Sequence, residues 1–212
     1  MNNVSVIIRN KNEERWIGHA IQSVVDFIDN PEIIIVDNNS TDNSKRVVST
    51  FDYLDIKTIK INEYTPGSAL NRGIELANND TILILSAHCV MTECNLEKID
   101  ELLKEYKAVW GKQIPIWNGK KINRRYVWSN FKDEDNINYF CKEEDRPFLH
   151  NALCFYNRQF LLENPFDERL SGKEDRYWAI DRVEEKHSIY YDSSLVAHHH
   201  YTDNGSTWKG VG

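Results

Sequence analysis

The stretch VSVIIRNKNEERWIGHAIQSVVDFIDNPEIIIVD, residues 4–37, decides the fold of this chain. It opens with an apolar run, residues 4–8, and closes with another, residues 33–36, and polar residues follow each run directly. Between them apolar residues recur at helical spacing, which predicts a helix over residues 13–27. Two short strands joined by an amphipathic helix form a βαβ unit, and the two strands of such a unit lie parallel.

The alternation of strand and helix continues as far as residue 115. Further apolar runs predict strands at residues 56–61, 81–85 and 108–114, and amphipathic patterns predict helices at residues 67–77 and 95–106. We therefore predict an α/β fold, a Rossmann-type sandwich in which helices flank a mostly parallel central sheet.

The remainder of the chain divides into two stretches. Residues 116–147 are rich in charged and aromatic residues without a clear period, and we interpret them as a variable insert. The strand and helix pattern then resumes, with expected elements at residues 148–156, 157–163, 174–182 and 188–191. No low-complexity linker interrupts the chain, so we expect residues 1–212 to form a single domain.

Composition excludes several classes of protein. Lys and Arg total 26 against 33 Asp and Glu, a net charge of −7, which argues against a nucleic-acid partner or a polybasic membrane binder. No apolar run reaches the ~18 residues that a membrane span needs. Four cysteines without a C-x-x-C pair are typical of reduced thiols, so we expect a cytoplasmic protein. One local basic cluster is suited to an anionic acceptor or a membrane-linked glycan, namely Lys120, Lys121, Arg124 and Arg125.

Polar clusters follow three of the predicted strands, at residues 9–14, 37–42 and 86–88. Ligands of open α/β sheets bind at the carboxyl ends of the strands, so these clusters are expected to converge on one crevice. Asp37 directly follows a buried strand, where a carboxylate can accept hydrogen bonds from a ribose hydroxyl or a base N–H. The alternative is a carboxylate that caps a turn or helix.

Four segments, in order, resemble family 2 glycosyltransferases of the GT-A fold. They are VSVIIRNKNEE (4–14), IIIVDNNSTDNS (33–44), GSALNRGIELANNDTILILSAHC (67–89) and NPFDERLSGKED (164–175). The resemblance implies inverting transfer of a sugar from a nucleotide-diphosphate donor to a hydroxyl of a glycan or lipid-linked glycan, in surface polysaccharide synthesis. It also implies that residues 1–115 bind the nucleotide sugar, that residues 148–212 form the acceptor side, and that the enzyme acts in the cytoplasm or at the inner face of the membrane.

The same resemblance implies a set of donor-binding residues. Position 70, where the family often has Arg, is Leu70 in this chain, and polar residues follow it. The implied donor contacts are Arg9, Asn10, Asn12, Glu13, Asp37, Asn39, Asn71, Arg72 and His88.

The clearest departure from the family lies at its metal motif. The family has Asp-x-Asp after the fourth strand, whereas this chain has Ser86-Ala87-His88. Imidazole is a good ligand for Mn²⁺ and later transition metals but a poor one for Mg²⁺. The polypeptide N-acetylgalactosaminyltransferases use Asp-x-His with a distant His, which suggests His198 or His200 as a second ligand here. The alternative is a metal-independent site in which His88, Arg72 or Lys209 offsets the diphosphate charge.

On the acceptor side, the resemblance implies that Asp175 is the general base, with Glu174 beside it. A carboxylate suits that role if it is ionised and within hydrogen-bond reach of the acceptor hydroxyl. The alternative is that both acids simply favour a helix N-terminus. His150 and Asn151 are expected to border the acceptor, and Trp178 is either a stacking platform for it or part of the core.

Two other functions compete with the transferase. A sugar nucleotidyltransferase needs a Gly-rich phosphate loop after the first strand, and residues 4–14 contain no Gly. The other is a degenerate, non-catalytic module that binds a nucleotide sugar but has lost the metal motif. The donor sugar, its base and the acceptor cannot be read from these patterns.

Overall fold

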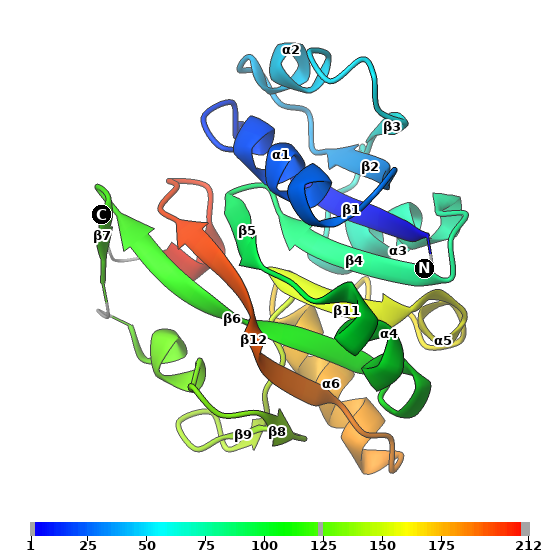
Figure 1. Ribbon diagram of the computed structural model, residues 1–212, viewed down its shortest axis with the longest axis vertical. Helices are drawn as coiled ribbons and strands as arrows, with labels where there is room; N and C mark the ends of the chain where they lie inside the picture. Colours follow the sequence, from blue (N-terminus) through cyan, green and yellow to red (C-terminus); the bar gives the residue numbers. More distant parts are fainter. Residues whose placement is uncertain (1–2, 123–124, 209–212) are drawn as a thin grey trace.

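The computed structural model describes residues 3–122 and 125–208, which build a sheet of ten strands covered by helices (Figure 1). The main path of the sheet is β3-β2-β1-β4-β11-β6-β12-β5. The sheet therefore runs without a break from the first half of the chain into the second, and the predicted α/β architecture is confirmed.

The first half of the sheet consists of parallel strands. Its elements are β1 (Val4–Asn10), α1 (Ile17–Phe27), β2 (Glu32–Asp37), α2 (Ser44–Val48), β3 (Ile56–Lys60), α3 (Pro66–Leu76) and β4 (Thr81–Ser86). Strand β1 pairs in parallel with β2 and β4, and β2 pairs in parallel with β3. The register aligns Asn10 with Asp37 and Arg9 with Ser86, so the polar ends of these strands meet at one edge, as predicted.

The second half contains strands of both directions. Its elements are β5 (Cys89–Glu93), α4 (Leu96–Glu105), β6 (Ala108–Trp117), β11 (Leu153–Asn157), α5 (Arg158–Glu163), α6 (Glu174–Glu184) and β12 (Tyr190–His200). Strand β11 runs antiparallel to β4 and β6, whereas β12 runs parallel to β6 and antiparallel to β5. The strand expected at residues 188–191 is thus the start of an eleven-residue strand. A register shift between Asp192 and Val196 interrupts its pattern.

The stretch expected to be a variable insert contributes short elements and core residues. These elements are β7 (Lys120–Lys121), η1 (Tyr126–Asn130), β8 (Asn136–Ile137), β9 (Phe140–Cys141) and β10 (Arg146–Pro147), and η2 (Ser206–Trp208) follows β12. Strand β7 pairs with β6 and β8 with β12, which ties the stretch to the main sheet. Val127, Trp128 and Phe131 are buried in the same core cluster as Trp110, so this stretch is an integral part of the domain.

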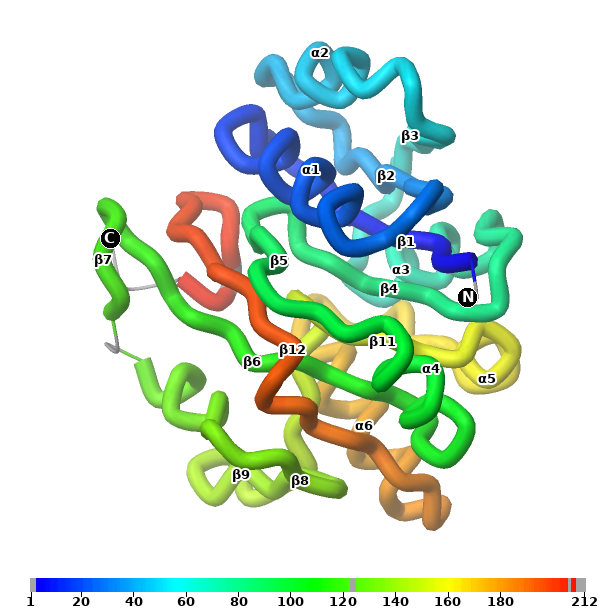
Figure 2. The backbone as a smooth tube through the Cα atoms, in the orientation of Figure 1, coloured from blue at the N-terminus to red at the C-terminus, as the bar shows by residue number. Residues whose placement is uncertain are grey.

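The sheet lies between two layers of helices (Figure 2). Side chains alternate along β1: Val6 and Ile8 pack with α1 and α4, whereas Ile7 packs with α3 and α6 on the opposite face. Both faces are closed by apolar clusters, which accounts for the continuous apolar runs in the parallel strands. Within the described residues, no helix is both long enough and apolar enough to cross a membrane.

Helix α3 holds the loop that precedes α6. The Asn71 side chain donates from Nδ2 to the carbonyl oxygen of Phe166 over 2.9 Å and accepts at Oδ1 from the Phe166 amide over 3.0 Å. Its Nδ2 also donates to Glu168. A Cβ added at Gly67 would lie 2.6 Å from the carbonyl oxygen of Asp167, so only glycine permits this close approach. Asn71 thereby satisfies both backbone groups of a buried residue.

We expect Asn71→Ala to lower the free energy of unfolding by about 2–3 kcal/mol, because it leaves two buried backbone groups of Phe166 unpaired. The neighbouring Arg72→Ala is the control, since Arg72 is exposed and its ion pair among the described residues is with Glu75 on the same helix. It is expected to change stability by less than about 0.5 kcal/mol. Urea denaturation of both variants tests this, and equal stabilities would contradict the role of Asn71.

Candidate active site

A cleft of about 600 Å³ opens at the carboxyl edge of the parallel strands. Residues from the ends of β1 and β4, from the start of α6 and from the segment around η1 line it together. The residues expected from the sequence that line it are Arg9, Asn10, Glu13, His88, His150, Asn151, Glu174 and Asp175. Residues expected on the donor side and residues expected on the acceptor side therefore share one cleft.

An ion pair joins the two sides of the cleft. Arg9, in β1, donates from Nη1 to Oε1 of Glu174, the first residue of α6, over 2.8 Å. Burial raises the pKa of Glu174, opposed by the attraction of Arg9. This contact fixes the N-terminus of α6 against the first strand.

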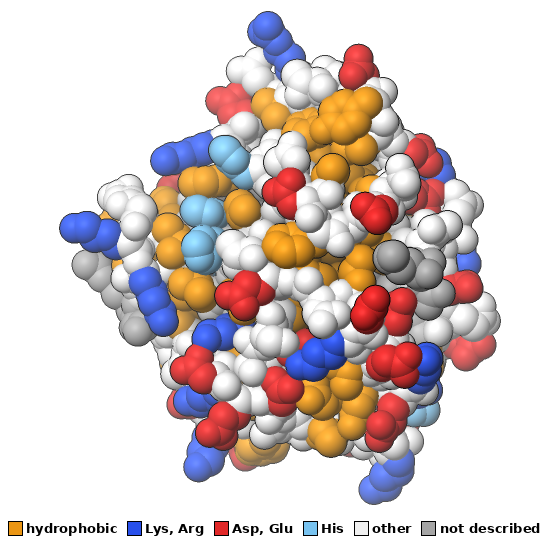
Figure 3. Space-filling model, in the orientation of Figure 1, with side chains coloured by type: hydrophobic (Ala, Val, Ile, Leu, Met, Phe, Trp, Pro, Cys, Tyr) orange, Lys and Arg blue, Asp and Glu red, His pale blue; other side chains and the backbone are white. Residues whose placement is uncertain are grey.

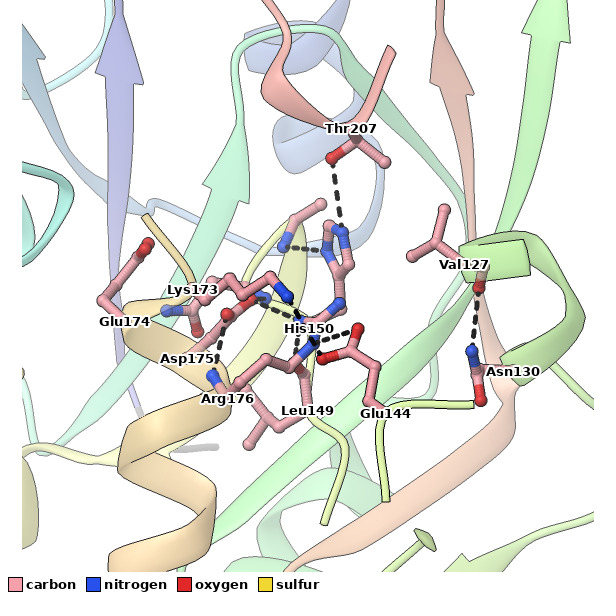
Figure 4. Close-up of polar contacts among 12 residues, drawn as sticks. Val127, Asn130, Glu144, Leu149, His150, Lys173, Glu174, Asp175, Arg176 and Thr207 are labelled. Carbon is pink, nitrogen blue, oxygen red and sulfur yellow. Dashed lines mark hydrogen bonds and ion pairs between the residues drawn. The ribbon is translucent and has the colours of Figure 1, made fainter. Parts of the chain in front are cut away.

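Asp175 is buried and held by three donors (Figure 4). Its Oδ2 accepts from the Asn151 amide over 3.0 Å and from Arg176 Nη1 over 2.8 Å, and its Oδ1 accepts from the Arg176 amide over 2.8 Å. Although burial opposes ionisation, the charge of Arg176 and these hydrogen bonds leave the pKa of Asp175 below its ordinary value. The side chain is therefore an ionised carboxylate at neutral pH, with one lone pair of Oδ1 still available.

The residues next to Asp175 are neutral hydrogen-bonding groups. Burial lowers the pKa of His150 to about 3, so its ring is uncharged. His150 Nδ1 accepts from the Ala152 amide, which puts the proton on Nε2, 3.4 Å from the hydroxyl oxygen of Thr207. Asn151 accepts from the Tyr156 hydroxyl, while its Nδ2, buried at the cleft, has no partner among the described residues. An unpartnered buried donor at a cleft is a ready contact for a ligand oxygen.

A charged cluster that the sequence did not predict lines the cleft together with Asp175. Glu144 accepts from the Tyr126 hydroxyl over 2.9 Å and from Arg146 Nε over 2.8 Å. It also lies 3.7 Å from Lys173 Nζ (Figure 4). The Arg176 guanidinium lies over the Phe148 ring at 3.8 Å. Arg176 directly follows the predicted base, which was a signal, whereas Glu144 lies in a stretch with no period to place it.

On the donor side, Asn10 and Asp37 contact each other. Asn10 Nδ2 donates to Asp37 Oδ1 and to Ser40 Oγ, each over 3.0 Å, while Asn10 Oδ1 is buried at the cleft without a partner among the described residues. Asp37 is 1% exposed, and its other oxygen accepts from the Ser40 amide. Although burial opposes ionisation of this carboxyl group, these hydrogen bonds leave the pKa of Asp37 below its ordinary value. Asp37 thus orients Asn10 and the turn after β2.

Three of the expected donor contacts have polar atoms engaged away from the cleft. Asn12 accepts at Oδ1 from the Thr41 amide, and Asn39 is exposed and donates to the carbonyl oxygen of Ile61. Arg72 is exposed on α3. Together with Asn71 and Asp37, these residues stand outside the lining of the cleft.

His88 belongs to a buried polar chain. Its Nδ1 lies 3.2 Å from Glu13 Oε1, and its Nε2 lies 3.0 Å from Nε2 of His199. His199 Nδ1 in turn lies 2.7 Å from Oε1 of Gln113, and Thr202 donates to Glu13. Burial lowers the pKa of His199 far below its ordinary value, so its ring is neutral. The chain connects the segments that follow β1 and β4 with β6 and β12.

The structure thus brings His199, rather than His198 or His200, to His88. His198 and His200 share the opposite side of β12, where His200 stacks on Trp16 with ring centroids 3.9 Å apart. In Figure 3 histidine side chains lie in a column over this end of β12. Trp178 is 3% exposed and packs with Tyr156 and Phe166, which is the core role considered for it. Two other residues named from the sequence, Arg124 and Lys209, lie outside the described residues.

Comparisons with known proteins identify the family and the fold. A model of the family described as glycosyl transferase family 2 matches residues 5–163. The minor teichoic acid biosynthesis protein GgaA of Bacillus subtilis is 26% identical over 189 residues, which cover 81% of this chain and 41% of that protein. The chain therefore spans less than half the length of this relative.

Solved structures share the fold. S. aureus TarS 1-349 in complex with UDP-GlcNAc matches with a TM-score of 0.72 and 18% identity, covering 98% of this chain and 61% of the other. The mannosyltransferase PcManGT from Pyrobaculum calidifontis in complex with GDP-Man and Mn²⁺ matches with a TM-score of 0.68 and 18% identity, covering 96% and 58%. The family match extends over most of the chain, and the chain belongs to glycosyl transferase family 2.

Proposed function

We propose that this protein transfers a sugar, with inversion at the anomeric carbon, from a nucleoside-diphosphate sugar to a hydroxyl of a surface glycan. The observation that carries the proposal is Asp175, a buried and ionised carboxylate. It lines the same cleft as the ends of β1 and β4. The relatives support the class of substrate, because one is a teichoic acid biosynthesis protein and one similar structure is a complex with UDP-GlcNAc.

The donor is proposed to lie along the carboxyl edge of β1 and β4. Asn10 offers a buried, unpartnered oxygen that suits an N–H of the base, and Asp37 holds it in that orientation. His88 lies farther along the cleft, where a diphosphate would follow the nucleoside. This arrangement supports nucleotide binding by the edge of the sheet, as in other open α/β folds.

In the proposed reaction, Asp175 takes the proton of the acceptor hydroxyl while that oxygen attacks the anomeric carbon. The bond between the anomeric carbon and the diphosphate oxygen breaks as the new glycosidic bond forms, and the nucleoside diphosphate leaves with the bonding electron pair. Attack opposite to the leaving group inverts the configuration. The remaining lone pair of Asp175 Oδ1 suits the hydroxyl, and Asn151 Nδ2 is a donor for an acceptor oxygen.

The fold family implies a divalent cation, and the histidine pair suits one. Two imidazole nitrogens favour Mn²⁺ or a later transition metal over Mg²⁺. Gln113 orients the far nitrogen of the His199 ring, and Glu13 Oε1 lies 3.2 Å from the far nitrogen of His88. No group of three or more His, Cys, Asp or Glu suited to a metal occurs among the described residues. The diphosphate would therefore complete the ligand set. When bound, the cation would offset negative charge on the leaving group.

We expect Asp175→Asn to lower kcat by about 10³-fold, because the amide cannot accept the proton of the attacking hydroxyl. Affinity for UDP, or whichever nucleoside diphosphate binds, should stay within about twofold of the parent, since Asp175 lies on the acceptor side. Steady-state rates and calorimetric titration measure the two quantities.

The control for this variant is Asp181→Asn, which removes the same charge from an exposed position of α6. Retained nucleotide affinity in Asp175→Asn would also confirm that the variant is folded. Unchanged turnover in Asp175→Asn would remove this residue from the mechanism.

For the metal, we expect His199→Ala to weaken Mn²⁺ binding in the presence of UDP by at least about tenfold, and His88→Ala to do the same. His198→Ala, which alters the neighbouring ring on the other side of β12, should leave the affinity unchanged. Electron paramagnetic resonance of free Mn²⁺ reports binding without any turnover. If UDP binds the parent protein equally well with and without Mn²⁺, the protein uses no metal for its donor.

A further inference from the structure

A second cavity, of about 440 Å³, lies beside the cleft. We call it the basic groove. It lies between β6, β7 and the segment from η1 onward, and its polar lining residues are Lys112, Gln113, Lys121, Arg125, Tyr126, Trp128, Ser129, Lys132 and Asp133. Apart from Gln113, which supports the histidine pair, none of the transfer chemistry proposed above uses this groove.

The groove is positively charged in a protein whose net charge is −7. Four cationic side chains line it against the single acid Asp133, which pairs with Lys112. Lys121 and Lys132 are exposed and form no ion pair with any described residue. In Figure 3 blue side chains project at the edge of the molecule where β7 lies. The surplus of positive charge favours an anionic ligand.

Two buried hydrogen-bond donors at the groove also favour an anionic ligand. Gln113 is 2% exposed and Trp128 is 5% exposed, and neither Gln113 Nε2 nor Trp128 Nε1 has a hydrogen-bond partner among the described residues. Gln113 uses its amide oxygen toward His199, which leaves its amide protons for another acceptor. Buried N–H groups without acceptors are costly, and an oxygen of a ligand would satisfy them.

The groove and the cleft share a wall. Arg125 and Tyr126 line both cavities, and Tyr126 also donates to Glu144 on the acceptor side. Arg125 donates to the carbonyl oxygen of Thr207, whose hydroxyl lies near His150. A chain-like ligand can therefore extend from the groove across Tyr126 toward Asp175. The position fits the acceptor rather than the donor, because Glu144 and Lys173 lie on the acceptor side.

We propose that the basic groove binds a phosphate group of the acceptor, so that the acceptor is a phosphate-bearing glycan or polyol chain. The cations supply the charge, and Gln113 and Trp128 supply two directed donors to phosphate oxygens. Phosphate suits the site better than a carboxylate, because its additional oxygens can accept from ammonium, indole and amide donors at once. The inference rests on the proposed function in one respect, because only that function makes the ligand of the groove an acceptor.

The test uses the full chain labelled with ¹⁵N and a short glycerol-phosphate oligomer as the probe. The indole N–H signal of Trp128, identified by its loss in Trp128→Phe, should shift on titration, and the affinity should fall as NaCl is added. The double variant K121A/K132A should bind the oligomer about five- to tenfold more weakly. The control K60A/K104A removes the same charge from exposed lysines outside the groove and should match the parent protein.

Three outcomes would overturn the inference. They are an unshifted Trp128 signal, equal affinity for an oligogalacturonate or for neutral maltotriose, and binding to phosphatidylglycerol vesicles that replaces binding to the soluble oligomer. Nucleoside diphosphate binding is measured in parallel. Loss of nucleotide binding alone would contradict the proposed function, whereas loss of oligomer binding alone would contradict the groove.

Discussion

The ion pair between Arg9 and Glu174 is the contact on which the geometry of the cleft depends. Arg9 lies near the end of the first strand and Glu174 begins α6, so one contact of 2.8 Å between a half-buried guanidinium and a buried carboxylate spans 165 positions of sequence. It sets the start of α6, and therefore Asp175, against the edge of the sheet where β1 and β4 end. A buried charge left without its partner is strongly destabilising, so this arrangement has little freedom to shift.

The second constraint is the chain from Glu13 through His88 and His199 to Gln113. Where the family has an acidic motif, this chain has two imidazole rings whose Nε2 atoms lie 3.0 Å apart. Its far end, Gln113, borders the basic groove. Gln113 thus orients the histidine pair with its amide oxygen and presents its amide protons to the groove. The proposed donor site and the groove therefore meet at this one residue.

The parallel half of the sheet could be predicted from sequence because its signal is local: apolar runs, helical spacing and polar strand ends are all read within a few residues. The side of β12 that faces His88 could not be predicted from sequence. Alternation predicts that His199 faces away from His198 and His200, but the irregularity between Asp192 and Val196 resets which set points inward. The structural role of Asn71 could not be predicted either, because its partner Phe166 lies 95 positions away in sequence. Trp128 and Phe131 enter the core from a stretch without a period, so the groove that they border could not be foreseen.

The most direct test of the central claim is a crystal structure with a nucleoside diphosphate bound. The account predicts a base beside Asn10, a diphosphate against His88, and the face toward Asp175 left open for an acceptor. A nucleotide bound in the basic groove, or a diphosphate on the side of Asp175 and Glu144, would contradict it.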